Sequence, residues 1–199
     1  YSIGSLAQEI MNKKNDMLVI HPEDRTTAML SLLYEGVPDV RLIDTPLSGK
    51  EVGRVLHHIP QSERIMLLGH GCGNGLFWRE DDTIPEFDGI MVGHKHAYYL
   101  RRHGANLVAV FCNADLFAKA NGLHGLFTGM IVTEMSEAAT YGIETTQEEL
   151  DRENIAFARR LRLLLDTCSL LSDIPKLLPA LDDAHTQLTE FNYSRVFYL

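Results

Sequence analysis

A histidine and a cysteine each stand where an apolar run of this sequence breaks off, and these two residue types can act together as nucleophile and base. Residues 65–68 lead into a glycine-rich turn that carries His70, and residues 106–111 lead directly into Cys112. A thiol attacks a carbonyl when it passes its proton to a base, and histidine is well suited to accept that proton near neutral pH. Because both runs predict strands of one sheet, we expect the two side chains to meet at its edge.

Backbone N–H groups beside the same two side chains could hold the oxyanion that such an attack creates. We assign this role to Gly71 and Cys112, since a residue without a Cβ lets a substrate carbonyl approach the main chain. A helix starting after Cys112 could also lower the pKa of its thiol. Four polar residues are expected to line the crevice and contact the substrate: Asn74, Asn113, Asp115 and Glu134. For the two acidic residues, helix capping and solvation are the competing interpretation.

The glycines at 69, 71, 73 and 75 also invite a nucleotide-binding interpretation. The pattern G-x-G-x-x-G fails in every frame, because its last position falls on Asn74, Leu76 or Trp78, and no P-loop lysine follows. A nonspecific phosphate site at this turn stays open as an alternative. We therefore expect no cofactor.

Histidines elsewhere raise the question of a metal site. Residues 93–96, Gly-His-Lys-His, resemble the end of a metallophosphoesterase motif, but the Asp-x-His and Gly-Asn-His segments that accompany it there are absent. Exposed histidines at the start of a helix account for this segment, so we expect no metal.

The composition is that of an ordinary globular protein of one domain. The chain has 199 residues, 45% of them hydrophobic, and its net charge of −9 argues against nucleic acid as a partner. Its three scattered cysteines cannot build a disulfide framework, which favours a reducing, cytoplasmic location. No run approaches the roughly 18 apolar residues that span a bilayer, so no membrane association is expected. The oligomeric state is not indicated.

Strands alternate with helices along most of the chain, which predicts a parallel sheet with right-handed crossovers. Strands are expected at residues 17–20, 40–43, 65–68, 107–111 and 126–132, with a short edge strand at 195–199 and a hairpin from 76–78 to 89–92. Helices are expected at 5–14, 95–102, 115–120 and 134–141, and one more within 172–191. Three further helices are expected to begin at a capping residue: one at Thr26 or Thr27, one at Ser48 that runs to 59, and one at Thr146 that runs to 168. We predict one three-layer α/β domain over residues 1–199, with a mainly parallel sheet of five or six strands and helices on both faces. Residues 1–145 would form the sheet core and 146–199 a helical cover.

The two strand ends resemble those of the caspase-like cysteine peptidases, a superfamily that includes caspases, clostripain, gingipains and the CHAT domains. The resemblance rests on Leu-Leu-Gly-His-Gly at 67–71 and Val-Ala-Val-Phe-Cys at 108–112, within residues 17–142, and Asn-Gly-Leu-Phe at 74–77 resembles the CHAT arrangement. It implies a caspase-like fold, with His70 as general base, Cys112 as nucleophile and Gly71 as an oxyanion donor.

The same resemblance implies a cysteine-dependent hydrolase acting on a peptide or protein. The residues around the thiol, Phe-Cys-Asn-Ala-Asp at 111–115, depart from the caspase pattern Gln-Ala-Cys-x-Gly. The alternative is therefore a catalytically inactive caspase-like or Rossmann-like module that recognises a peptide or a phosphate-bearing ligand at the turn 69–75.

Overall fold

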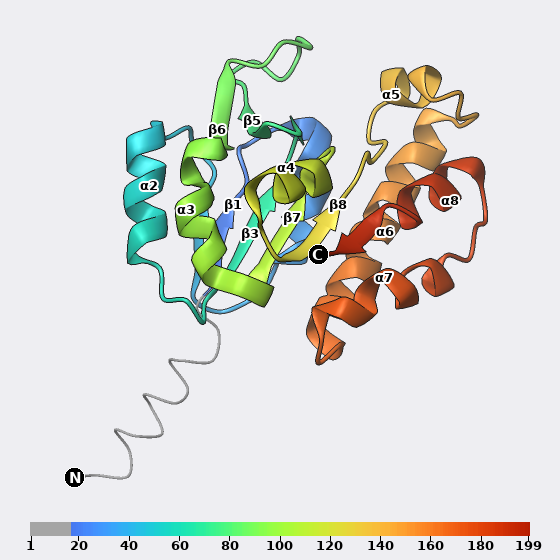
Figure 1. The fold of residues 1–199 in the computed structure, drawn as a ribbon. Coiled ribbons are helices and arrows are strands. Elements are labelled where there is room, and N and C mark those ends of the chain that lie inside the picture. The colour runs from blue at the N-terminus through green and yellow to red at the C-terminus, as the bar shows by residue number, and fades with distance from the viewer. Residues whose placement is uncertain (1–16) are drawn as a thin grey trace.

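The computed structural model describes residues 17–199, and its centre is a six-stranded sheet (Figure 1). The strand order is β2-β1-β3-β7-β8-β9, and every neighbouring pair is parallel except β8 with β9. The strands are β1 (Met17–Ile20), β2 (Val40–Ile43), β3 (Arg64–Leu68), β7 (Leu107–Val110), β8 (Gly125–Thr128) and β9 (Val196–Tyr198). The predicted mainly parallel sheet of five or six strands is confirmed. The helix predicted at 5–14 lies outside the described residues.

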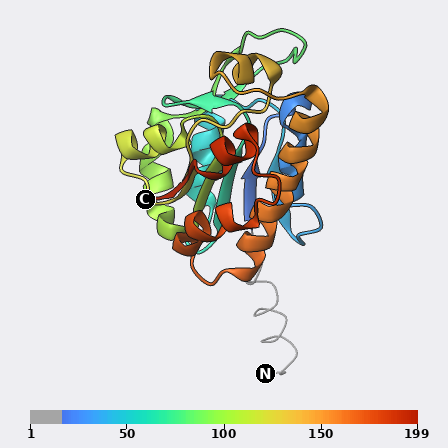
Figure 2. The same ribbon diagram turned by 90° about the vertical axis from the view of Figure 1, so that its right-hand side faces the viewer.

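Helices cover both faces of this sheet, which confirms the three-layer α/β architecture. The described helices, with η for a 3-10 helix, are η1 (Arg25–Leu33), α2 (Gly49–His58), η2 (His94–His96), α3 (Ala97–Leu100), η3 (Arg101–Asn106), α4 (Ala114–Asn121), α5 (Met135–Thr140), α6 (Gln147–Thr167), η4 (Leu171–Asp173), α7 (Ile174–Leu177), η5 (Pro179–Leu181) and α8 (Gln187–Tyr193). Helices α2, α3 and α4 pack on one face, and η1, α6 and α7 on the other. Figure 2 shows the C-terminal helices lying across the second face.

Register in the middle of the sheet brings the two predicted catalytic residues to one edge. In the parallel pair β3 and β7, Leu68 lies opposite Val110, and the Gly69 N–H extends the pairing by donating to the Val110 carbonyl at 3.1 Å. Both strands are buried along nearly their whole length, which is why they read as continuous apolar runs. The residues that follow them, His70 and Cys112, therefore leave the sheet side by side.

A small antiparallel sheet stands over this edge. It consists of β4 (Gly71–Cys72), β5 (Gly75–Trp78) and β6 (Gly89–Gly93). The predicted hairpin is confirmed, whereas β4 was not foreseen because it is too short to form a pattern. The loop from 79 to 88 between β5 and β6 projects from the body of the protein (Figure 1), and we call it the hairpin loop.

Three predicted elements differ in detail. Helix η1 is capped by Asp24, not by Thr26 or Thr27, because the Asp24 carboxylate accepts the Thr26 N–H. Strand β8 ends at Thr128 and does not reach 132, and the next residue, Gly129, accepts the Asn113 N–H at 3.1 Å and donates to the Arg195 carbonyl at 2.8 Å. The helix expected at 95–102 is divided into η2, α3 and η3. The short edge strand predicted at 195–199 is confirmed as β9, which pairs with β8.

Candidate functional site

His70 and Cys112 line one cavity at the carboxyl edge of β3 and β7. The cavity has a volume of about 430 Å³. Its other lining residues come from the turn after β3, the hairpin loop, the segments that follow β7 and β8, and the start of α5: Gly71, Arg79, Asp82, Thr83, Ile84, Pro85, Phe87, Asn113, Met130, Glu134, Ser136 and Glu137. The same pair also lines a small enclosed cavity beneath it, of about 20 Å³, against α6. The fold thus places the predicted nucleophile and base at a common wall.

The imidazole of His70 is held in one tautomer by a threonine. Its Nε2 lies 2.6 Å from Thr26 Oγ1, and the Thr26 hydroxyl donates its single proton to Asp24 Oδ1, also at 2.6 Å. Because that proton is committed to the carboxylate, the hydroxyl must accept from His70, so Nε2 carries the hydrogen. Nδ1 is left as the basic nitrogen, and it has no hydrogen-bond partner within residues 17–199.

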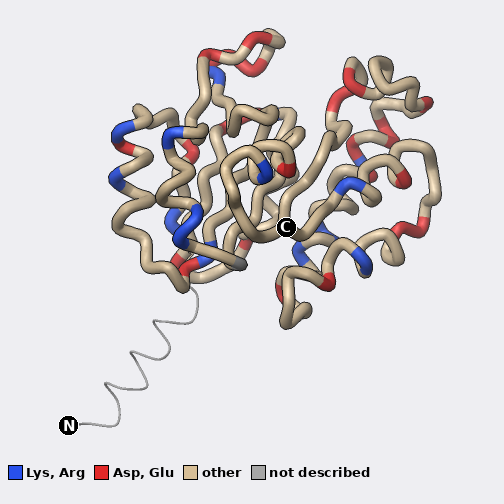
Figure 3. Tube along the Cα trace, in the orientation of Figure 1, with Lys and Arg blue, Asp and Glu red and all other residues tan. Residues whose placement is uncertain are grey.

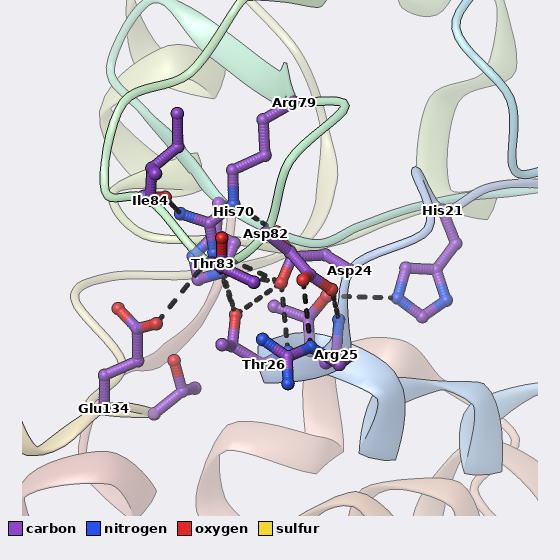
Figure 4. Close-up of polar contacts among 12 residues, drawn as sticks. His21, Asp24, Arg25, Thr26, His70, Arg79, Asp82, Thr83, Ile84 and Glu134 are labelled. Atoms are coloured by element: carbon purple, nitrogen blue, oxygen red, sulfur yellow. Dashed lines mark hydrogen bonds and ion pairs between the residues drawn. The ribbon is translucent and has the colours of Figure 1, made fainter.

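Asp24 is in turn held by a buried arginine of the hairpin loop. Arg79 donates from Nε to Asp24 Oδ2 at 2.7 Å and from Nη2 to Oδ1 at 3.2 Å, and its Nη1 holds the loop by donating to the Ile84 carbonyl at 2.7 Å (Figure 4). Burial alone would raise the pKa of Asp24. The hydrogen bonds from its neighbours outweigh burial and hold this pKa well below its ordinary value. Asp24 is therefore ionised at neutral pH and anchors both His70 and the loop.

The thiol of Cys112 is neutral in the free protein. Burial, reinforced by the nearby Glu137 carboxylate, raises its pKa to about 12, and the neutral thiol donates a hydrogen bond to the Ile131 carbonyl at 3.3 Å. The expectation that a following helix would lower this pKa is wrong, because the loss of hydration outweighs any effect of α4. Attack by this sulfur therefore requires that a base remove its proton.

A strained turn fixes the position of that sulfur. Asn113 has a φ of 60°, in the left-handed region that asparagine tolerates better than most residues. Its N–H donates to the Gly129 carbonyl, and the Ala114 N–H donates to the Phe111 carbonyl, so the chain reverses directly after Cys112. The turn holds Asn113 in the cavity wall.

Two glutamates form the side of the cavity opposite the hairpin loop. Glu137 is partly buried, and its carboxylate accepts the backbone N–H groups of Thr133 at 2.8 Å and Glu134 at 3.3 Å. Burial raises the pKa of Glu137. Glu134 is more accessible, with a side chain 32% exposed, and lies 4.0 Å from Arg79 Nη2. The cavity therefore presents acidic groups to whatever enters it.

The other predicted site residues make contacts within the protein itself. Gly71 lines the cavity, but a Cβ there would fall 2.4 Å from the Phe111 ring and 2.5 Å from the Gly75 carbonyl oxygen, so close packing within the protein requires this glycine. Asn74 contacts His94 at 3.2 Å, and Asp115 lies 3.6 Å from Lys119 on its own helix. Neither is among the residues that line the cavity of about 430 Å³.

The sequence analysis did not predict the three residues that hold the His70 ring in place, directly or through one another: Asp24, Thr26 and Arg79. Asp24 and Thr26 follow β1, and Arg79 follows β5, so the three residues come from two distant segments. The position of Asp24 and Thr26 directly after β1 could have indicated their place in the site, because polar residues that follow neighbouring parallel strands converge at one edge of the sheet. No pattern in the sequence pointed to Arg79.

The histidine segment 93–96 is used structurally. The buried ring of His96 accepts the Gly93 N–H at Nδ1, at 3.0 Å, and its Nε2 lies 2.8 Å from the Gly49 carbonyl oxygen, to which it must donate. In residues 17–199 no cluster of three or more His, Cys, Asp or Glu side chains is arranged to hold a metal ion. None of the helices in that part of the chain is long and apolar enough to cross a membrane.

No protein-family model matches this sequence, and no curated protein matches it. The site must therefore be interpreted from its own geometry and electrostatics.

The raised pKa of Cys112 makes a direct kinetic prediction. Near neutral pH, iodoacetamide should alkylate Cys112 on the order of 10²-fold more slowly than it alkylates N-acetylcysteine, because raising a pKa lowers the thiolate fraction at every pH below it. Replacing Glu137 with glutamine removes a negative neighbour and should accelerate the reaction. Quantifying the modified Cys112 peptide by mass spectrometry measures both rates, and a wild-type rate above that of the free thiol would contradict the prediction.

Proposed function

We propose that this protein is a cysteine-dependent hydrolase that acts on peptides, with Cys112 as nucleophile and His70 as general base. The observation that carries the proposal is that a thiol and an imidazole from the ends of neighbouring strands line one cavity. The tautomer of His70 supports it further, since its unprotonated nitrogen is free to take a proton. The proposed chemistry agrees with the caspase-like resemblance of the two strand ends.

In the proposed reaction, proton removal accompanies attack, because the resting thiol is neutral. His70 Nδ1 takes the thiol proton as Cys112 Sγ attacks the carbonyl carbon, and the N–H groups of Gly71 and Cys112 stabilise the oxyanion. His70 then gives the proton to the leaving amine, so that the C–N bond breaks and a thioester remains. Water, deprotonated by the same imidazole, hydrolyses the thioester and restores the thiol.

The roles of Thr26, Asp24 and Arg79 follow from this scheme. Thr26 and Asp24 contact His70 or Arg79 and do not line the cavity, so they act as positioning residues, and Arg79 holds Asp24 in place from the cavity wall. The hydroxyl fixes the ring, and the Asp24 carboxylate, 3.8 Å from Nε2, stabilises the imidazolium that forms during attack.

The charge of the cavity favours peptides with basic side chains. Arg79, the cation in its wall, is paired with the buried Asp24 at 2.7 Å and lies 4.0 Å from Glu134, whose partly exposed carboxylate stays accessible from the cavity. A cation on the substrate would be attracted to this side, and a phosphate would be repelled.

The test is covalent capture by substrate-like electrophiles. A panel of peptidyl acyloxymethyl ketones with basic, acidic, polar and apolar side chains is incubated with the protein, and mass spectrometry locates the adduct. We expect a single adduct at Cys112, formed fastest by the basic members and lost when His70 is replaced with glutamine. Labelling spread equally over Cys72, Cys112 and Cys168 would overturn the proposal.

The second candidate is a peptide-binding module that performs no chemistry. The observation that favours it is the raised pKa of Cys112, which is typical of a buried thiol that stays protonated and unreactive. Saturable binding of basic peptides, with equal affinity for wild type and Cys112→Ala and with neither labelling nor turnover, would establish this function in place of the first.

A further inference from the structure

A second cavity lies between α2 and the segment formed by η2 and α3, away from His70 and Cys112. Its volume is about 590 Å³. It is lined by Gly49, Lys50, Gly53, Arg54, His57, His58, Lys95, His96 and Tyr99, none of which lines the first cavity. Figure 3 shows the Lys and Arg positions on α2 and beside it, whereas acidic positions predominate on the hairpin loop and around α5.

Three cations are concentrated at this cavity in a protein whose net charge is −9. Within the described residues, Lys50 and Lys95 take part in no ion pair, and Arg54 interacts with the Glu51 carboxylate only through a longer-range Coulomb attraction. Like charges gathered around a concave surface repel one another, and a bound anion relieves that repulsion.

The N-terminus of α2 adds to the positive potential. A Cβ at Gly49 would fall 2.2 Å from Lys95 Nζ, so the ammonium group lies against the first residue of the helix. The helix end carries a partial positive charge of its own. Glu51 is the acidic residue in this turn, and its carboxylate is engaged in the capping box, where it accepts the Ser48 N–H at 2.7 Å. The Lys95 ammonium group and the N-terminus of α2 therefore lie side by side.

Aromatic groups provide the rest of the wall. The His57 ring packs edge-on against Tyr99, with the ring centroids 6.0 Å apart. Both nitrogens of His96 are used within the protein, and His58 Nδ1 is bonded to the Arg54 carbonyl at 2.7 Å. The ring nitrogens of His57 have no partner in the described structure, so they can contact a ligand.

We propose that this cavity is a binding site for a small molecule that carries two or more phosphates. Lys50, Arg54 and Lys95 hold the phosphate oxygens, and the rings of His57 and Tyr99 contact the remainder of the ligand. The volume of about 590 Å³ falls within the usual range for small-molecule sites. A long polyanion such as nucleic acid is disfavoured, because it would extend over the acidic surface of the protein.

The test is a titration of the full chain with inorganic pyrophosphate, followed by ¹H–¹⁵N NMR at constant ionic strength. We expect saturable shifts of the amides of Gly49, Gly53 and Tyr99. The double variant Lys50→Gln/Lys95→Gln should bind at least about tenfold more weakly, since it loses two charge-assisted contacts. The variant Arg102→Gln/Lys176→Gln removes the same charge from exposed positions outside the cavity and should bind as the wild type does.

Three results would overturn this proposal. They are the absence of saturable shifts, equal weakening in both double variants, and tighter binding of single-stranded DNA than of pyrophosphate, which would indicate a polyanion surface. Because the readout is binding alone, the test is independent of the chemistry proposed for Cys112.

Discussion

Replacing Cys112 with alanine should lower kcat/KM for peptide hydrolysis by at least on the order of 10³-fold, because the substitution removes the atom that forms the thioester. The substrate would be the basic peptide preferred in the labelling experiment. The loss should fall on kcat, with KM little changed, since the cavity walls stay intact. Measuring initial rates with a fluorogenic peptide gives both constants.

Cys72→Ala is the matched control for this experiment. Cys72 lies in β4, next to Gly71, but it does not line the cavity. The control should keep wild-type activity, and circular dichroism checks that both variants fold. Activity that survives in Cys112→Ala would exclude Cys112 as the nucleophile.

Replacing Arg79 with methionine should lower the free energy of unfolding by about 3–5 kcal/mol, because it leaves the Asp24 carboxylate buried without its main partner. The side chains of Arg79 and Asp24 are only 4% and 6% exposed, so the pair is largely shielded from water. Denaturant unfolding at neutral pH measures the loss.

The effect of this substitution should depend on pH. The depressed pKa of Asp24 means that its ionised form contributes stability above the unfolded-state pKa, roughly pH 4, and that this contribution is lost as the pH falls toward the folded-state value. In Arg79→Met the carboxyl group can protonate at mildly acidic pH, so the difference from wild type should shrink below about pH 4.

An exposed pair of the same residue types serves as the control. Arg25 Nε lies 2.9 Å from Asp82 Oδ1, but the Arg25 side chain is 71% exposed. Arg25→Met should cost no more than about 1 kcal/mol, because water solvates both charges after the pair is broken. Equal losses from Arg25→Met and Arg79→Met would contradict the role of burial.

Most of the framework could be predicted from local patterns. Strands β1 and β2 were predicted with their observed bounds, since buried apolar runs end where polar or turn-forming residues begin. The caps at Ser48 and Thr146 were also confirmed, because a cap is a contact between residues three positions apart. The end of β8 was predicted wrongly, because Gly129 bonds to Asn113 and Arg195, two residues that are distant in the sequence.

The sequence by itself determined that His70 and Cys112 each follow a buried apolar strand, because such strands are visible as local apolar runs. The tertiary structure decided that these two strands, β3 and β7, are neighbours in register. Only the tertiary structure decided the electrostatic state of the two side chains. The pairing of Arg79 with Asp24 joins residues 55 positions apart, and the pKa of the Cys112 thiol depends on burial and on the Glu137 carboxylate. Coulomb forces and desolvation depend on distance in space, which no local pattern encodes. The strand ends could therefore be located in advance, but the protonation states of their side chains could not.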